Sequence, residues 1–154
     1  MKGEELKRID KNNKGELPNA PKIIITVKNV TNPKGILDNT KAIMKVVSQY
    51  AYTDKWPTDE EWKEILPIWF VESMTLKTSE DRDRDENLWH YESWIDNIRQ
   101  RFWLWYSSKA EKDSIQIVLE ALSIPYLYDS LLYTFYSQGV PMENIDVKDD
   151  VYDS

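Results

Sequence analysis

The fold is decided by two apolar runs, Phe102-Trp103-Leu104-Trp105-Tyr106 and Ile115-Gln116-Ile117-Val118-Leu119. Both are rich in the aromatic and β-branched side chains that favour strands, and the charged stretch 109–113 joins them. They therefore predict a β-hairpin. Because side chains alternate along a strand, Trp103 and Trp105 share one face of the first run, and apolar side chains also occupy the other. We expect helices or a partner to cover one of these faces.

Three further stretches have the character of strands. Ile23–Val27 is a β-branched run, and Asn32–Gly35 after it is typical of a turn. Ile68–Val71 fits either a buried strand or a further helical turn, and we favour the strand. Ile145–Val147 is predicted to be a last short strand.

Apolar side chains recur at helical spacing elsewhere in the chain. The first helix is expected to begin at Asp38 or Thr40, and Thr58–Glu61 is a capping box that begins the second. Gly139 is placed to end the last helix with a left-handed residue. The predicted inner faces of the first, third and last helices are, in that order, Ile43, Val46, Val47 and Tyr50; Leu88, Tyr91, Trp94, Ile95 and Ile98; and Leu127, Leu131 and Phe135.

This order of elements predicts an α/β fold of the α+β kind. We expect a single domain with a mixed, mostly antiparallel sheet of about four to five strands and three to four packed helices. Residues 1–21 are polar and interrupted by glycine and proline, which favours a flexible charged arm. The domain is expected to span 22–148, with an acidic tail at 149–154.

The chain is acidic and rich in aromatic side chains. Seven Trp and nine Tyr stand among 154 residues, so we expect some to reach the surface, where they favour interfaces. The net charge is −7: residues 1–50 carry ten Lys and Arg against five Asp and Glu, and residues 51–154 carry ten against twenty-two. Such a field repels nucleic-acid phosphates and steers a basic protein toward the acidic part.

The N-terminal residues Met1–Arg8 are charged rather than apolar, and cysteine is absent. No apolar run approaches the ~20 residues that span a membrane. The sequence therefore predicts a cytoplasmic protein without disulfides or membrane contact.

Residue types that carry catalysis are sparse. His90 is the only histidine, and the four glycines are too widely spaced for a dinucleotide fingerprint or a P-loop. Residues 81–92 match part of a calcium-loop template, but Glu86 stands where its sharp turn needs glycine. We predict no catalytic residue, no metal site and no cofactor.

Two acidic segments with aromatic side chains are the predicted partner-binding residues. Carboxylates steer a basic partner and aromatic rings anchor it. For each segment taken singly the alternative is structural: the acidic first turn of a helix for one, a frayed tail for the other. The residues are Asp81, Asp83, Asp85, Glu86 and Trp89 in the first segment, and Asp146, Asp149, Asp150 and Tyr152 in the second.

Three patches lie between Trp62 and Gly139: Trp62-Lys63-Glu64-Ile65-Leu66-Pro67-Ile68-Trp69-Phe70, Arg101-Phe102-Trp103-Leu104-Trp105-Tyr106-Ser107, and Ile124-Pro125 leading through Leu131-Leu132 to Gly139. Their layout resembles the small cytoplasmic immunity proteins encoded beside bacterial polymorphic and contact-dependent toxins. The resemblance implies a non-enzyme that caps a cognate toxin's active site or locks its fold. Many such toxins are nucleases whose basic clefts an acidic aromatic face can occupy.

The sequence thus favours a monomer or weak homodimer that binds a cognate toxin. Two alternatives stay open. One is a different binder, such as an acidic nucleic-acid mimic or an adaptor in phage defence or secretion. The other is a small hydrolase that uses a buried carboxylate pair.

Overall fold

The two runs of the predicted hairpin lie side by side in the computed structural model, as β2 (Trp103–Ala110) and β3 (Ile115–Ala121). Their antiparallel register aligns Trp105 with Leu119 and shifts between Trp105 and Ser107. The structure describes residues 2–11, 13–19, 21–51, 55–75, 91–100, 102–122 and 128–149. The hairpin prediction is confirmed.

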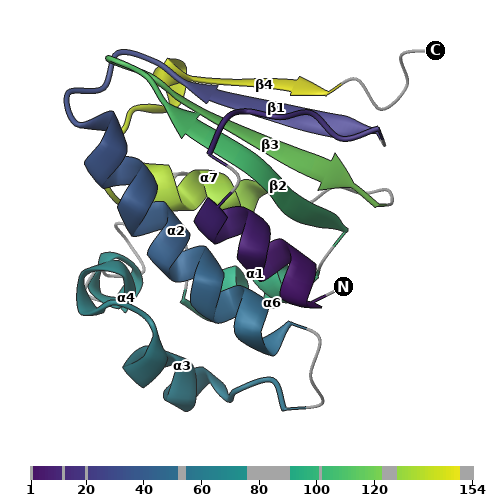
Figure 1. Ribbon diagram of the computed structural model, residues 1–154. Coiled ribbons are helices and arrows are strands. Elements are labelled where there is room, and N and C mark those ends of the chain that lie inside the picture. The colour runs from purple at the N-terminus through teal and green to yellow at the C-terminus, as the bar shows by residue number, and fades with distance from the viewer. Residues whose placement is uncertain are drawn as a thin grey trace.

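Two further strands complete the sheet. β1 (Lys22–Val27) pairs antiparallel with β3 on one side and with β4 (Ile145–Asp149) on the other. The order is therefore β2-β3-β1-β4, and β2 and β4 are its edges among the described residues (Figure 1). The predicted α+β class and strand number are confirmed, and every pairing is antiparallel.

Six α-helices occur in the described residues, more than the three to four expected. In Figure 1 they lie below the sheet. Alternate strand residues that face them, such as Ile23 and Ile117, are fully buried in one core with side chains from the helices. The helices are α1 (Lys2–Lys11), α2 (Pro33–Tyr50), α3 (Asp59–Ile65), α4 (Ile68–Thr75), α6 (Tyr91–Arg99) and α7 (Asp129–Tyr136), and a short 3-10 helix, η1 (Met142–Asn144), precedes β4.

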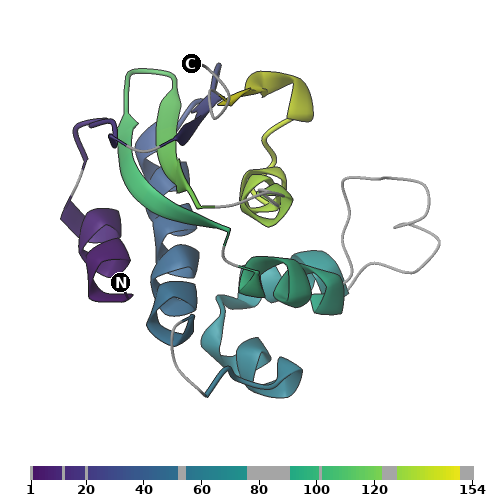
Figure 2. The same cartoon turned by 90° about the vertical axis from the view of Figure 1, so that its right-hand side faces the viewer.

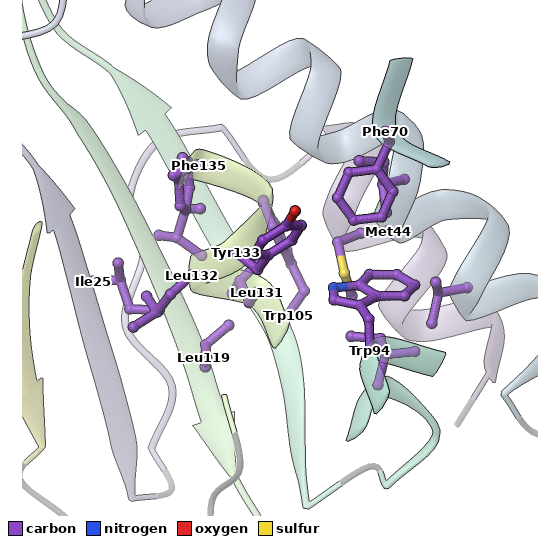
Figure 3. Close-up of a cluster of buried hydrophobic side chains, with 14 of the residues drawn as sticks. Ile25, Met44, Phe70, Trp94, Trp105, Leu119, Leu131, Leu132, Tyr133 and Phe135 are labelled. Atoms are coloured by element: carbon purple, nitrogen blue, oxygen red, sulfur yellow. The ribbon is translucent and has the colours of Figure 1, made fainter. Parts of the chain in front are cut away.

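The core uses most of the tryptophans. Trp62, Trp94, Trp103 and Trp105 are fully or almost fully buried. The Trp94 ring centroid lies 4.8 Å from that of Phe70, edge to face, and Figure 3 shows these two rings beside Tyr133. The Trp94 Nε1–H donates to a backbone oxygen of α7 at 2.9 Å. Indole is therefore mainly a packing element here, which the sequence expectation understated.

The predicted flexible arm is wrong for residues 2–11. This segment is α1, which lies beside α2 and against β2 (Figure 2). Ile9 is fully buried in the core, and the buried Glu5 carboxylate accepts the backbone N–H of Trp105 at 2.8 Å. The Arg8 guanidinium lies 4.6 Å from the ring centre of Tyr106. A short polar helix has little propensity of its own, so these tertiary contacts, invisible in sequence, stabilise it.

The segment after α1 crosses to the sheet face that is opposite the helices. The Ser107 hydroxyl, whose residue aligns with Val118, donates to the backbone oxygen of Glu16 at 2.6 Å. A Cβ on Gly15 would come within 3.1 Å of the Gln116 amide oxygen. Pro18 is buried there as well. We expected helices or a partner to cover one apolar face of the hairpin. Helices cover one face, and this segment of the same chain covers the other.

Helix α2 begins earlier than predicted. Asn32 is the N-cap, its side chain accepting the N–H of Gly35 at 3.2 Å, and Pro33 is the first helical residue. Asp38 and Thr40 therefore lie inside the helix instead of capping it. Proline suits a first helical turn because its missing N–H would be unsatisfied there anyway. The predicted turn at 32–35 is in fact this first turn.

The strand favoured for Ile68–Val71 is also wrong, because these residues open α4. The carbonyl of Pro67 accepts the N–H groups of Phe70 and Val71, both at 3.1 Å, and so starts the helix. Leu66, Phe70, Val71 and Met74 are buried. Within α4, Phe70, Val71 and Met74 have helical spacing, and Ile68, Trp69 and Glu72 are exposed on the other side.

The remaining helix predictions are confirmed where the structure describes them. The Thr58 capping box is present, with the Glu61 carboxylate accepting the Thr58 N–H at 3.0 Å. Gly139 has a φ of +87° at the end of the last helix. The inner face of α6 is buried at Tyr91, Trp94, Ile95 and Ile98. Leu88 and Leu127 lie outside the described residues.

Candidate partner-binding surface

Helices α3 and α4 are joined at a sharp corner. α3 ends at Ile65, Leu66 has extended backbone, and Pro67 supplies the carbonyl from which α4 starts. Proline forces this break because it disfavours helical backbone in the residue before it. The corner gives the two short helices different directions, as the lower part of Figure 1 shows.

The inner side of this pair is held by aromatic contacts. The Trp62 ring lies 5.5 Å from that of Tyr50 and 5.0 Å from that of Trp56, both measured between ring centroids. On α4, Phe70 contacts the rings of Trp94 and Tyr133 at centroid distances of 4.8 and 5.9 Å. Large buried rings on both helices fix the backbone from which the outer side chains project.

The outer side of α4 exposes large apolar side chains. Ile68 is 72% exposed and Trp69 is 37% exposed. Both lie one helical turn from the exposed Glu72, at spacings of four and three, so the three share one face. The rest of the Trp69 surface is covered by the protein, and its ring meets that of Phe70 edge to face at a centroid distance of 5.7 Å.

Acidic side chains accompany this apolar pair. Residues 59–75 contain five Asp and Glu and one Lys. Glu64 and Glu72 are exposed and have no ion-pair partner in the described part of the chain, whereas Glu60 pairs with Lys63 at 3.3 Å. We call the exposed side chains Glu60, Glu64, Ile68, Trp69 and Glu72 the α3–α4 surface.

Tyr91 ties this surface to the core. Its hydroxyl donates to the backbone oxygen of Asp59 at 2.6 Å, and its ring lies under the Lys63 ammonium, 5.5 Å from the ring centre. Burial raises the pKa of Tyr91 far above its ordinary value, and the nearby charges of Asp59, Glu60 and Glu92 raise it further. The phenol therefore stays protonated and keeps the start of α3 in place.

Seven of the nine predicted binding residues lie outside the described residues, and their role stays a prediction. The other two, Asp146 and Asp149, are on β4. Asp146 aligns with Thr26 and Asp149 with Ile23, so the two carboxylates belong to opposite faces of the sheet. The Asp146 carboxylate contacts the Lys28 ammonium at 2.6 Å. The structure does not bring these two together as one site. The seven are Asp81, Asp83, Asp85, Glu86, Trp89, Asp150 and Tyr152.

The sequence reasoning missed Ile68 and Trp69 because the strand favoured for Ile68–Val71 placed both in the core. The signal was present in the helical spacing of Phe70, Val71 and Met74, which leaves Ile68 and Trp69 off the inner face of a helix.

A second feature lies on the opposite flank of the molecule. A hollow of about 290 Å³ between α1 and the following segment is lined by Glu4, Lys7, Arg8, Lys11 and Glu16. The Arg8 guanidinium approaches the Glu4 carboxylate at 3.7 Å. Three cations and two carboxylates largely offset one another here, and no exposed apolar anchor lies among them, so we favour the α3–α4 surface.

Comparisons with known proteins found no family model, no curated protein and no solved structure that matches this chain. Within the ranges that the structure describes, no group of three or more His, Asp or Glu side chains could hold a metal ion. Nor does any described helix have the length and apolar character needed to cross a membrane.

Proposed function

We propose that this chain is a non-enzymatic binding protein that recognises a basic partner protein through the α3–α4 surface. The observation that supports the proposal is the exposed pair Ile68 and Trp69 one helical turn from Glu72, an exposed carboxylate with no ion-pair partner in the described residues. An exposed tryptophan loses contact with water when a partner covers it, and tryptophan is among the residues that contribute most to binding energy.

The acidic side chains would act at longer range. Glu64 and Glu72 are exposed to solvent, and neither forms an ion pair in the described residues. Such charges raise the encounter rate with a basic partner, and salt screens the effect over about 8–10 Å. The surface therefore combines an anchor that slows dissociation with a field that speeds association.

The partner we propose is a bacterial toxin, which makes this chain an immunity protein acting in the cytoplasm. The resemblance described above supports this class, and the acidic charge fits a toxin with a basic substrate cleft, such as a nuclease.

The test measures how charge reversal in this chain changes its binding to the purified partner. Expression of the full chain in its native cell, followed by isolation of what binds, supplies that partner. The double variant Glu64→Lys and Glu72→Lys should then lower the association rate about tenfold at low salt, with a shallower salt dependence. The double reversal Asp113→Lys and Glu143→Lys, at exposed residues of the hairpin turn and of η1, changes the net charge equally and is the matched control.

Two results would contradict the proposal. One is a partner that binds the double variant and the control at the same rate at every salt concentration. The other is an isolated partner whose binding face is acidic. If the wild-type chain binds a toxin but leaves the activity of that toxin unchanged, the chain is a binding protein and not an immunity protein.

A further inference from the structure

Strand β4 is an edge of the sheet, and its charges are arranged to complement a second copy of itself. In the described residues it has one neighbouring strand, β1 (Figure 1). An edge strand presents backbone N–H and C=O groups that can pair with another chain. Its sequence, Ile145-Asp146-Val147-Lys148-Asp149, places opposite charges on either side of Val147.

The register shows which backbone groups point outward. The N–H of Lys28 donates to the carbonyl of Asn144 at 2.8 Å, and these two residues continue the alignment of β1 with β4. Hydrogen-bonded pairs alternate along an antiparallel ladder. Asp146 and Lys148 therefore direct their backbone groups toward β1, whereas Val147 directs its N–H and C=O away from the sheet.

We propose that two copies of this protein associate through β4, in an antiparallel pair centred on Val147. In that register the backbone N–H and C=O of Val147 form two hydrogen bonds with the C=O and N–H of Val147 in the second copy. Asp146 then lies directly opposite Lys148 of the second copy, and Lys148 opposite its Asp146. These are non-hydrogen-bonded pairs, in which cross-strand side chains come closest. The two sheets would join into one continuous sheet with all helices on the same side.

The charges select this register. The outward backbone groups allow pairs centred on Ile145, Val147 or Asp149. A pair centred on Asp149 would set two carboxylates directly opposite each other, which is destabilising, and one centred on Ile145 would leave Asp146 and Lys148 without opposite charges across the contact. Lysine on an edge strand commonly prevents pairing, but here an acidic residue two positions away compensates it in one register. Lys148 is exposed and has no ion-pair partner among the described residues, so its charge is available. Asp146 contacts Lys28, yet both side chains stay more than half exposed, so this contact can be shared or exchanged.

The contact is small, because five residues of one strand bury much less than the ~1,200 Å² of a stable interface. The dimer is therefore weak, and it leaves the α3–α4 surface free. This inference does not depend on the proposed function.

The test is sedimentation equilibrium of the full chain from about 10 μM to 1 mM. Wild type should show a reversible monomer–dimer equilibrium. Asp146→Lys sets two lysines opposite two lysines, and Lys148→Asp sets acids opposite acids, so each should weaken self-association at least about tenfold. The double variant, with the two charges exchanged, restores opposite pairs and should return the dissociation constant to within about threefold of wild type.

Mixing the two single variants is the most specific test of the proposed register. Neither should form a homodimer, but together they place lysines opposite acids and should form a heterodimer. Hydrogen exchange provides a check without mutation: the Val147 amide should become more protected as wild-type concentration rises. Wild type that stays monomeric at 1 mM overturns the proposal. So does a dimer that both reversals leave intact, or a mixture that fails to associate.

Discussion

The hairpin β2–β3 and the α3–α4 surface use the same residue type in opposite ways. Trp103 and Trp105, both on β2, are almost completely buried and belong to the core. Trp69 leaves more than a third of its surface to solvent beside the fully buried Phe70. The difference teaches that the aromatic content of this chain serves mainly stability, and that binding must be sought at the few rings the core does not use.

The largest effect expected from this comparison is at Trp105. Replacing this buried indole with alanine leaves a cavity beneath the sheet and should lower the free energy of unfolding by about 3–5 kcal/mol. Urea unfolding followed by circular dichroism measures it. A loss below about 1 kcal/mol would show that the hairpin does not organise the core.

A smaller effect is expected at Glu5. Its carboxylate accepts the Trp105 N–H, so Glu5→Ala leaves a buried backbone donor unsatisfied and should cost about 1–3 kcal/mol. Glu4→Ala is the matched control, since Glu4 is exposed and its contact with Arg8 is worth well under about 1 kcal/mol. Equal losses for the two variants would mean that α1 does not depend on this bond.

Tyr91 gives the third effect, and it depends on pH. Tyr91→Phe removes the hydrogen bond to Asp59 and should cost about 1 kcal/mol at pH 7. The unfolded chain loses the phenol proton near pH 10, whereas the folded chain keeps it because its pKa is raised. The folded state therefore binds more protons, and stability falls as pH rises above about 10. The Tyr91→Phe variant should show a shallower fall, measured by urea unfolding between pH 8 and 11.

Much of the fold could be predicted because the apolar patterns are local. The hairpin runs, the capping box at Thr58 and the left-handed Gly139 each depend on a few consecutive residues. α1 could not be found in this way, since Glu5 contacts a strand one hundred residues further along the chain. Ile68–Val71 was assigned to the wrong element because four apolar residues carry no clear period.

The candidate site was harder to predict for the same reason. Acidic segments are visible in sequence, but exposure of Trp69 follows from the corner at Pro67 and from the packing of Phe70 against Trp94. Trp94 is far from α4 in the sequence. The charge pattern predicts a basic partner, which stays a prediction, and the structure was needed to find the exposed apolar residues of α4.

The most direct test of the account compares the affinities of Trp69→Ala and Leu122→Ala for the isolated basic partner. Leu122 is 51% exposed and follows β3, so it controls for loss of exposed apolar area. We predict that Trp69→Ala weakens binding by at least about 2 kcal/mol, roughly thirtyfold, while circular dichroism shows that the variant stays folded. Equal affinities for Trp69→Ala, Leu122→Ala and wild type would contradict the central claim.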